Sequence, residues 1–376
     1  MAAGRYFPGG HPALAEKLDC FLARLAASLG AQPFAEKAAF LLLAGGYGRG
    51  EGGIFQATES APAQLYNDLE FYLVLRDPAA ERDAARWCHD EAHRGEEEIG
   101  IEVEFKVLTL AALHGAGPSM FYYDLLAAHG FVWGDAALVA ALPARLRDPA
   151  LIPAHEATRL LFNRGTGLLF CQQKLADSGA GVDSAFLERN HAKVRLALAD
   201  AVLALNGRYH FSCRTRHERL GEPLAHTPPD WPQLKDWHAS AVDFKFHPRH
   251  ENPAHETLRA RQSELVATWT ETFLWLESLR LRHNFRTPAD YAAWPGRLFP
   301  EFPPARNFLL HLRDRLRRGT PPRGWLDYPR APLQRTLLAL LGSLPASTAA
   351  YLLALPAAAT ADEIHTAYRR WWSFYN

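Results

Sequence analysis

The chain has 376 residues, of which 48% are hydrophobic and 22% charged, the composition of a globular protein with enough apolar material for two or three domains. Its 41 basic and 41 acidic residues give a formal net charge of zero, so no strong overall attraction to nucleic acid is expected. The longest apolar run, residues 337–344, is too short to span a membrane, and four scattered cysteines without CxxC spacing suit a reduced compartment. We therefore expect a soluble, cytoplasmic protein without a membrane partner.

The first part of the chain combines helix-like and strand-like segments, which predicts a domain built on a mixed sheet. Apolar residues recur at helical spacing in some segments and alternate with polar residues in others. In chain order, the expected segments are a helix at 12–29, strands at 40–43 and 69–75, a helix at 79–95, a strand at 100–109, a helix from 121 to near 130 and a short strand at 131–135. A glycine-rich turn and a long spacer separate the first two strands.

Beyond residue 149 the strand-like alternation gives way to helical periodicity. Alanine and leucine dominate residues 184–206, the strongest helical segment of the chain. Further helices are expected at 154–178, 255–284, 306–318, 332–344 and 361–376. The pattern predicts an α/β (α+β) domain with a mixed sheet over residues 1–148, a helical bundle over 149–285 and a C-terminal helical region over 286–376.

Acidic residues stand at the beginning of the strand at 69–75. Asp68 and Glu70 are two positions apart, so their side chains point to the same face with Cα atoms roughly 6.5–7 Å apart. Two such carboxylates repel each other unless a cation lies between them, and Mg²⁺ accepts oxygen ligands of this kind. The strand at 100–109 offers a third acid on one face, either Glu102 or Glu104, and both remain candidates.

The glycine-rich turn suits an anionic ligand. Gly45 and Gly46 lack a Cβ atom, so backbone N–H groups can approach phosphate oxygens closely. Arg49, three residues later, carries a planar guanidinium group that matches phosphate geometry. Together with the acids, the turn indicates a site for a nucleotide and a divalent metal ion.

The order of these features resembles a known superfamily. The segment GGYGRGE at 45–51, followed by Asp68-Leu69-Glu70, is similar to the glycine turn and the Asp-x-Asp/Glu strand of the DNA polymerase β-type nucleotidyltransferases. The wording GGYGRGE looks like that of bacterial protein uridylyl- and adenylyltransferases, whereas the domain order is similar to that of aminoglycoside nucleotidyltransferases. The spacer before Asp68 is longer than is usual in the superfamily, and Asn67 stands where serine is common.

The resemblance implies that residues 1–148 form a nucleotidyltransferase domain, which moves a nucleoside monophosphate from an NTP to a hydroxyl group and releases pyrophosphate. It implies Mg²⁺ or Mn²⁺ as the cofactor. The length of the chain, its helical second part and the absence of a basic excess favour a small molecule or a protein over nucleic acid as the acceptor. The residues that would be catalytic and bind metal are Asp68, Glu70 and Glu104, and those that would bind the nucleotide are Gly45, Gly46, Arg49 and Lys193. The helical domains of related enzymes lend a lysine to the phosphates, and Lys193 is the candidate; an exposed or internally paired lysine is the alternative.

Two other functions remain open at this point. A catalytically silent nucleotide-binding regulator, or a component of a toxin–antitoxin pair, would keep the fold and lose the transfer reaction. An RNA-tailing enzyme is the other, and it depends on the arginines of the segment 306–318 alone.

Overall fold

The computed structural model describes residues 4–58, 60–177, 183–249, 251–319 and 321–375, and the chain divides into two compact units. Unit 1 consists of Met1–Pro153, Asn206–Ala225 and Lys235–His250, and unit 2 of Ala154–Leu205, His226–Leu234 and Glu251–Asn376. The sequence predicts three consecutive regions instead. The division differs because two segments from the expected helical bundle, 206–225 and 235–250, pack within unit 1.

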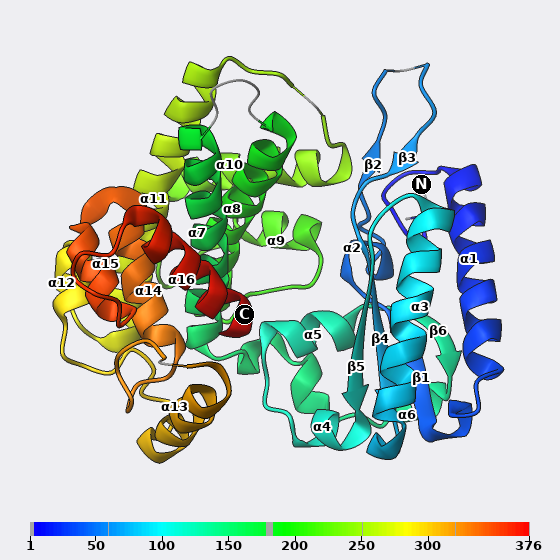
Figure 1. The fold of residues 1–376 in the computed structure, drawn as a ribbon. Helices are drawn as coiled ribbons and strands as arrows, with labels where there is room; N and C mark the ends of the chain where they lie inside the picture. The colour runs from blue at the N-terminus through cyan, green and yellow to red at the C-terminus, as the bar shows by residue number, and fades with distance from the viewer. Residues whose placement is uncertain (1–3, 59, 178–182, 250, 320, 376) are drawn as a thin grey trace. The chain divides into compact units, whose positions relative to one another are not determined.

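Unit 1 is built on a four-stranded mixed sheet (Figure 1). Its strands are β1 (Ala38–Leu43), β4 (Leu69–Leu75), β5 (Val103–Thr109) and β6 (Gly130–Gly134), in the order β5-β4-β1-β6. β4 and β5 run parallel, whereas β1 is antiparallel to both of its neighbours. The helices of this unit are α1 (Pro12–Gly30), α2 (Gly45–Gly48), α3 (Glu81–Ile99), α4 (Leu110–Gly115), α5 (Met120–Ala127), α6 (Ala136–Ala140), α9 (Cys213–Arg219) and most of α10 (Trp231–Phe246).

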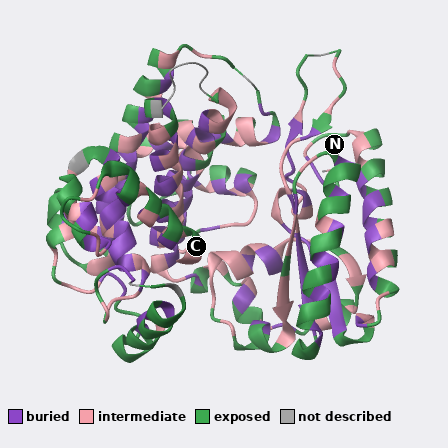
Figure 2. Cartoon of the chain, viewed as in Figure 1, coloured by how far each residue is buried: buried purple, intermediate pink, exposed green. Residues whose placement is uncertain are grey.

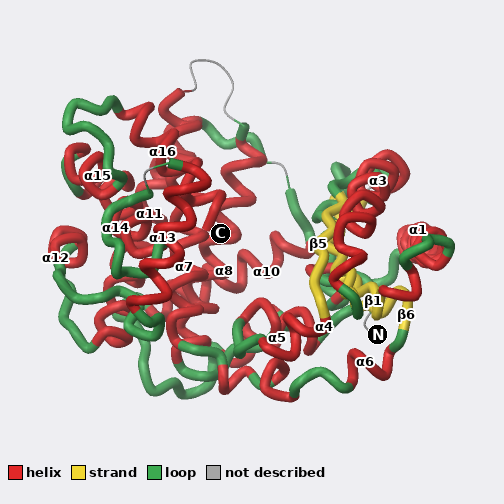
Figure 3. The backbone as a smooth tube through the Cα atoms, turned by 60° about the horizontal axis from the view of Figure 1, so that its bottom comes forward, coloured by secondary structure: helices red, strands yellow, loops and turns green. Residues whose placement is uncertain are grey.

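Helices cover both faces of the sheet (Figure 3). On one face, α1 and α3 pack on the odd-numbered residues of β4 and β5, where Phe71 stacks on Phe105 with ring centroids 4.9 Å apart. On the other face, α5 and α6 pack on the even-numbered residues, among them Tyr72 and Val74 of β4. β1 is therefore buried along its whole length (Figure 2), and the sheet forms the middle layer of the unit.

The long spacer of the sequence forms a small hairpin of β2 (Ile54–Phe55) and β3 (Gln64–Leu65). The fully buried Tyr47 holds its base, because its hydroxyl donates to the Gly53 carbonyl oxygen at 2.9 Å and accepts from the Tyr66 N–H group at 3.0 Å. Asn67 accepts a hydrogen bond from the Gly53 N–H group at 2.8 Å. The insertion is thus pinned to the glycine turn and leaves the register of β4 intact.

Unit 2 is helical, and its described residues contain no strand. Its helices are α7 (Ala154–Asp177), α8 (Ser184–Leu205), α11 (His255–Leu281), α12 (Pro288–Ala293), α13 (Pro304–Arg318), α14 (Arg330–Leu338), α15 (Ala346–Leu352) and α16 (Ala361–Tyr375). Glu277, which is fully buried, accepts hydrogen bonds from Thr158, Arg280 and Tyr291 and so joins α7, α11 and α12. Among the described residues, none of the helices combines the length and the hydrophobicity that a membrane span requires.

Most of the expected elements are confirmed, and their ends shift by a few residues. The strand predicted at 69–75 has these bounds in the structure, and the helix predicted at 12–29 is α1. The helix predicted at 79–95 continues to Ile99, where Gly100 ends it with a left-handed φ of 84°. The glycine-rich turn, which the sequence predicts as a loop, contains one helical turn, α2.

Candidate functional site

The three predicted acids share one face of the sheet. The parallel register of β4 and β5 places Glu70 opposite Glu104, and residues paired in this way project their side chains to the same side. Asp68 lies two residues before Glu70, on that same side. It is the face that also carries Tyr72 and is covered by α5. Parallel pairing therefore gathers acids from two strands that are more than 30 positions apart in the chain.

The charges of these side chains act on one another. Burial raises the pKa of Glu70, and the negative charges of Asp68 and Glu104 raise it further. The pKa of the Tyr72 hydroxyl is raised by burial and by the same three acids. A cation placed among them would relieve this repulsion.

The register of β4 and β5 distinguishes the two candidates for the third acid, Glu102 and Glu104. Glu102 is exposed and precedes β5, where its carbonyl oxygen accepts a hydrogen bond from the Leu69 N–H group at 2.9 Å. Glu104 is half-buried, lies opposite Glu70 and contributes to the raised pKa of that residue. The arrangement favours Glu104 as the third acid.

Lys106 and Tyr72 also belong to the site, and the sequence argument missed both. The Lys106 ammonium nitrogen lies 3.8 Å from Glu104 Oε2 and 5.8 Å from the centre of the Tyr72 ring. Its charge lowers the pKa of Glu70 and so opposes the effect of the neighbouring acids. The signal was present, because Tyr72 and Lys106 each follow a predicted site acid by two positions on its strand.

Gly45 and Glu70 are in close contact. Gly45 has a φ of +63°, a region that side-chain-bearing residues rarely adopt, and a Cβ atom added there would lie 2.8 Å from Glu70 Oε1. The carboxylate thus occupies the space that any other residue at position 45 would fill. Gly46 contacts the end of the same turn, because its carbonyl oxygen accepts a hydrogen bond from the Glu51 N–H group at 2.8 Å.

Arg49 is held by the protein. Its Nη1 atom donates to Asp124 Oδ2 on α5 at 3.0 Å, and the hydroxyl group of Tyr209 donates to the same oxygen at 3.2 Å. The Arg49 side chain is only 15% exposed, and its Nε atom is buried without a hydrogen-bond partner. Its predicted contact with nucleotide phosphates stays a prediction, and the structure adds Asp124 as the residue that orients it.

Glu51, the last residue of the GGYGRGE segment, has a structural role that the sequence does not reveal. Its carboxylate accepts hydrogen bonds from Ser212 Oγ at 2.7 Å, the Cys213 N–H group at 2.9 Å and Lys245 Nζ at 2.9 Å. Burial alone would raise the pKa of Glu51, but Lys245 and Ser212 outweigh it and lower the pKa to about 2. Glu51 thereby fixes the segments 206–225 and 235–250 to the glycine turn.

Lys193 belongs to the other unit. It lies on α8 of unit 2 and is exposed, whereas the six other predicted site residues all belong to unit 1. Its place in a nucleotide site is therefore an expectation that comes from the family resemblance alone.

The donor chemistry of the site fits a hard divalent cation. Asp68, Glu70 and Glu104 offer carboxylate oxygens, which are the ligands that Mg²⁺ prefers. Among the described residues, however, no three His, Cys, Asp or Glu side chains are already arranged closely enough to hold a metal ion. The three acids are the kind of ligand that a divalent cation prefers, and a cation would relieve the repulsion that Asp68 and Glu104 exert on Glu70. Binding would require the three carboxylates to turn inward.

Comparisons with known proteins provide no further guide to this site. The chain matches no known family model, and no curated protein sequence matches it. The functional argument for this chain therefore depends on the acids, the glycine turn and their geometry.

Proposed function

We propose that this protein is a divalent-metal-dependent nucleotidyltransferase of the DNA polymerase β type. It would transfer a nucleoside monophosphate from an NTP to a hydroxyl group of a small molecule or a protein and release pyrophosphate. The observation that carries the proposal is the pairing of Glu70 with Glu104 beside Asp68, directly against the glycine turn at Gly45.

The proposed roles follow from the position of each residue. Asp68, Glu70 and Glu104 would hold Mg²⁺ or Mn²⁺, which when bound supplies positive charge to the attacking and leaving oxygens of a phosphoryl displacement. Glu104, whose side chain is 43% exposed, is accessible enough to accept the proton of the acceptor hydroxyl group. Gly45 and Gly46 leave room for the triphosphate to approach the backbone.

Arg49 would act on the nucleotide from a fixed position. Asp124 holds one end of its guanidinium group, so the remaining N–H groups keep one orientation and lose little entropy when an anion binds. A phosphate contact from this group would stabilise the charge that develops as pyrophosphate leaves. Lys193 would be a second phosphate contact, on the family resemblance alone.

The proposal is tested by incubating the full chain with each α-labelled NTP, Mg²⁺ and a cell lysate, and by asking whether label appears on protein, on a small molecule or on RNA. Asp68→Asn should lower the rate at least about a thousandfold, because it removes a ligand that no neighbour replaces. Asp83→Asn, which changes an exposed acid on α3, is the matched control and should keep the wild-type rate. An unchanged rate in Asp68→Asn would exclude the metal role.

The third acid is assigned by a second pair of variants. Glu104→Gln should remove most of the transfer activity, whereas Glu102→Gln should retain it, because only Glu104 lies opposite Glu70. The reverse result would move the third ligand to Glu102 and leave the proposed reaction standing.

Two observations favour a silent nucleotide-binding regulator as a second candidate. The described residues present no ready-made group of three metal ligands, and Lys106 lies close to Glu104. Such a protein would bind ATP without releasing pyrophosphate across a broad panel of acceptors. Release that depends on Asp68 would reject this candidate.

A further inference from the structure

Helix α13 of unit 2 packs with its polar side inward. Asn307, His311 and Asp314 follow one another at helical spacing, and each is fully buried. This is the reverse of the usual arrangement, in which an amphipathic helix turns its apolar side to the protein. The buried polar side therefore holds the helix in place.

Specific hydrogen bonds fix this orientation. The amide of Asn307 donates to the Leu326 carbonyl oxygen at 3.1 Å, and His311 Nε2 lies 3.1 Å from the Asp327 carbonyl oxygen. Asp314 accepts a hydrogen bond from the Tyr375 hydroxyl group at 2.6 Å. Rotation of α13 to bury its leucines would break these bonds and leave buried polar groups unsatisfied.

The opposite side of α13 is apolar and open to solvent. The exposed large apolar residues of the helix are Phe308, Leu309, Leu312 and Leu316. At about 100° of rotation per residue they fall within an arc of about 100°. Leu309 is 63% exposed and Leu316 is 79% exposed, which are high values for leucine. Leu326, exposed in the loop that follows, and Trp325, whose ring lies 5.8 Å from that of Phe308, extend this apolar stripe.

The charges beside the stripe indicate what covers it. Exposed arginines border it on both sides, namely Arg315 on one side and Arg306, Arg313 and Arg317 on the other. Asp314 is the only acidic residue of the helix, and it is buried and bonded to Arg313 and Tyr375. Because the whole chain has no net charge, this basic character is local to α13.

Charge argues against a second copy of the chain and in favour of an anionic surface. Two copies that met through this stripe would bring their arginine borders together, and the one acid of each helix, Asp314, is buried and balances only Arg313. Leucine and aromatic side chains between arginines are typical of helices that lie in the interface of an anionic lipid bilayer, where apolar groups reach the acyl chains and arginines reach the phosphates.

We infer that α13 docks unit 2 on the surface of a membrane rich in anionic phospholipids. The occupant of the stripe is the headgroup and upper acyl region of the bilayer, and the protein remains on one side of the membrane. This inference does not depend on the proposed transfer reaction, because α13 belongs to unit 2 and the predicted acids belong to unit 1. It departs from the composition-based expectation of no membrane partner, which the absence of a spanning segment suggested.

The test is flotation of the full chain with vesicles made of equal parts phosphatidylcholine and phosphatidylglycerol, compared with vesicles of phosphatidylcholine alone. The chain should float with the anionic vesicles and not with the neutral ones. Leu309→Ser/Leu316→Ser should weaken this binding at least about tenfold, because two anchoring side chains are lost. Both leucines are exposed, so the variant should keep the wild-type unfolding temperature. Leu151→Ser, which changes an exposed leucine of unit 1, should bind like the wild type.

The arginines are tested separately. Arg315→Gln/Arg317→Gln should weaken binding about thirtyfold, because two charges near the membrane surface are lost. The matched change Arg82→Gln/Arg189→Gln of exposed arginines elsewhere should leave binding unchanged.

Four results would overturn the inference. The first is a failure to float with anionic vesicles, and the second is equal flotation of the wild type and the serine variant. The third is a concentration-dependent dimer that the serine variant abolishes without any vesicle binding, which would assign the stripe to a second copy. Tight binding of a purified acidic protein through the stripe, again without vesicle binding, would likewise replace the membrane by a protein partner.

Discussion

Glu51 and Lys245 form an ion pair with 2.9 Å between Oε2 and Nζ, although 194 positions separate them in the chain. Both side chains are largely buried, at 6% and 17% exposure. The pair ties the end of the glycine turn to α10, and two further hydrogen bonds tie it to the beginning of α9. It explains why residues from the middle of the chain complete unit 1.

The Glu51 ion pair should make the stability of unit 1 depend on acid pH. The pKa of Glu51 is about 2 in the folded protein and ordinarily near 4.5. Above pH 4.5 the carboxylate is therefore ionised in both the folded and the unfolded chain, and the full stabilisation by the ion pair is present. As the pH falls from 4.5 toward 2, the unfolded chain binds the proton first and the stabilisation, about 3 kcal/mol, is lost. Urea unfolding should therefore show Glu51→Gln far less stable than the wild type at neutral pH and nearly equal to it only near pH 2. A constant difference across this range would contradict the assignment.

Glu70 should make stability depend on pH in the opposite direction to Glu51, because burial, Asp68 and Glu104 raise the pKa of Glu70. Between the ordinary and the raised pKa the folded protein holds a proton that the unfolded chain has lost, so stability falls as the pH rises through this interval. Once Glu70 is ionised in the folded protein, the burial and the neighbouring acids that raise its pKa cost stability in the absence of metal. Glu70→Gln should raise the thermal unfolding midpoint in the presence of a chelator and abolish the proposed transfer reaction.

Added Mg²⁺ provides the internal control for Glu70. It should raise the unfolding midpoint of the wild type, since a ligand that binds only the folded state stabilises it, and should raise that of Glu70→Gln much less. A lower midpoint for Glu70→Gln without metal would mean that the ionised carboxylate is stabilised by its surroundings.

Gly45→Ala and Gly100→Ala form a matched pair. Both glycines have a positive φ, +63° and +84°, so alanine at either position should cost about 1 kcal/mol of stability. At Gly100 the new methyl group meets nothing within 4 Å, whereas at Gly45 it would lie 2.8 Å from Glu70 Oε1 and displace the carboxylate. Transfer activity should fall about a hundredfold in Gly45→Ala alone. Equal activity in the two variants would show that the Glu70 position is not critical.

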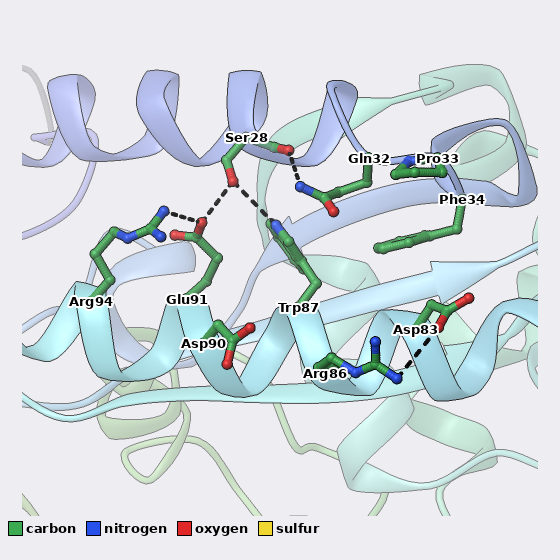
Figure 4. Close-up of a pocket in the computed structure, with 10 residues that line it drawn as sticks. All are labelled: Ser28, Gln32, Pro33, Phe34, Asp83, Arg86, Trp87, Asp90, Glu91 and Arg94. Atoms are coloured by element: carbon green, nitrogen blue, oxygen red, sulfur yellow. Dashed lines mark hydrogen bonds and ion pairs between the residues drawn. The ribbon is translucent and has the colours of Figure 1, made fainter.

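Glu91 should be a main determinant of the packing between α1 and α3 (Figure 4). Its carboxylate is 2% exposed and accepts hydrogen bonds from Ser28 at 2.6 Å, Arg24 at 2.7 Å and Arg94 at 2.8 Å. Glu91→Ala should lower the free energy of unfolding by about 3 kcal/mol, because it leaves these donors without their acceptor. The experiment is urea unfolding at neutral pH.

Glu98→Ala is the control for Glu91. Glu98 binds the same Arg24 at 2.7 Å but is 37% exposed, so its loss should cost less than about 1 kcal/mol. Similar losses in the two variants would show that burial does not set the strength of these contacts.

Local patterns were enough to predict the elements around the acids. The strand at 69–75 is confirmed with its bounds, because an apolar run interrupted only by Glu70 and shorter than most helices is typical of a buried strand. The acids on it were found for the same reason, since side chains two positions apart on a strand share a face whatever surrounds them. The mixed sheet and the helical second part of the chain are likewise confirmed.

Other features depend on partners that no local pattern specifies. The sequence shows Glu51 only as a polar residue at the end of a motif. Its structural role depends on hydrogen bonds from Lys245 and Ser212, which lie in distant segments. The spacing of the leucines in α13 does not show that they are exposed, because this depends on Asn307 and Asp314, which hold the inner side of the helix. Tyr72 and Lys106 became part of the site only when β4 and β5 paired.

The sequence by itself determined the secondary structure near the site, the glycine turn and the face on which Asp68 and Glu70 lie. These follow from interactions within a few residues along the chain, which a local pattern records. The tertiary structure alone decided that Glu104 is opposite Glu70, that Glu51 closes unit 1 and that α13 shows its leucines to solvent. Each of these depends on contacts between distant segments, where burial and unsatisfied hydrogen bonds rather than local propensity determine which arrangement is most stable.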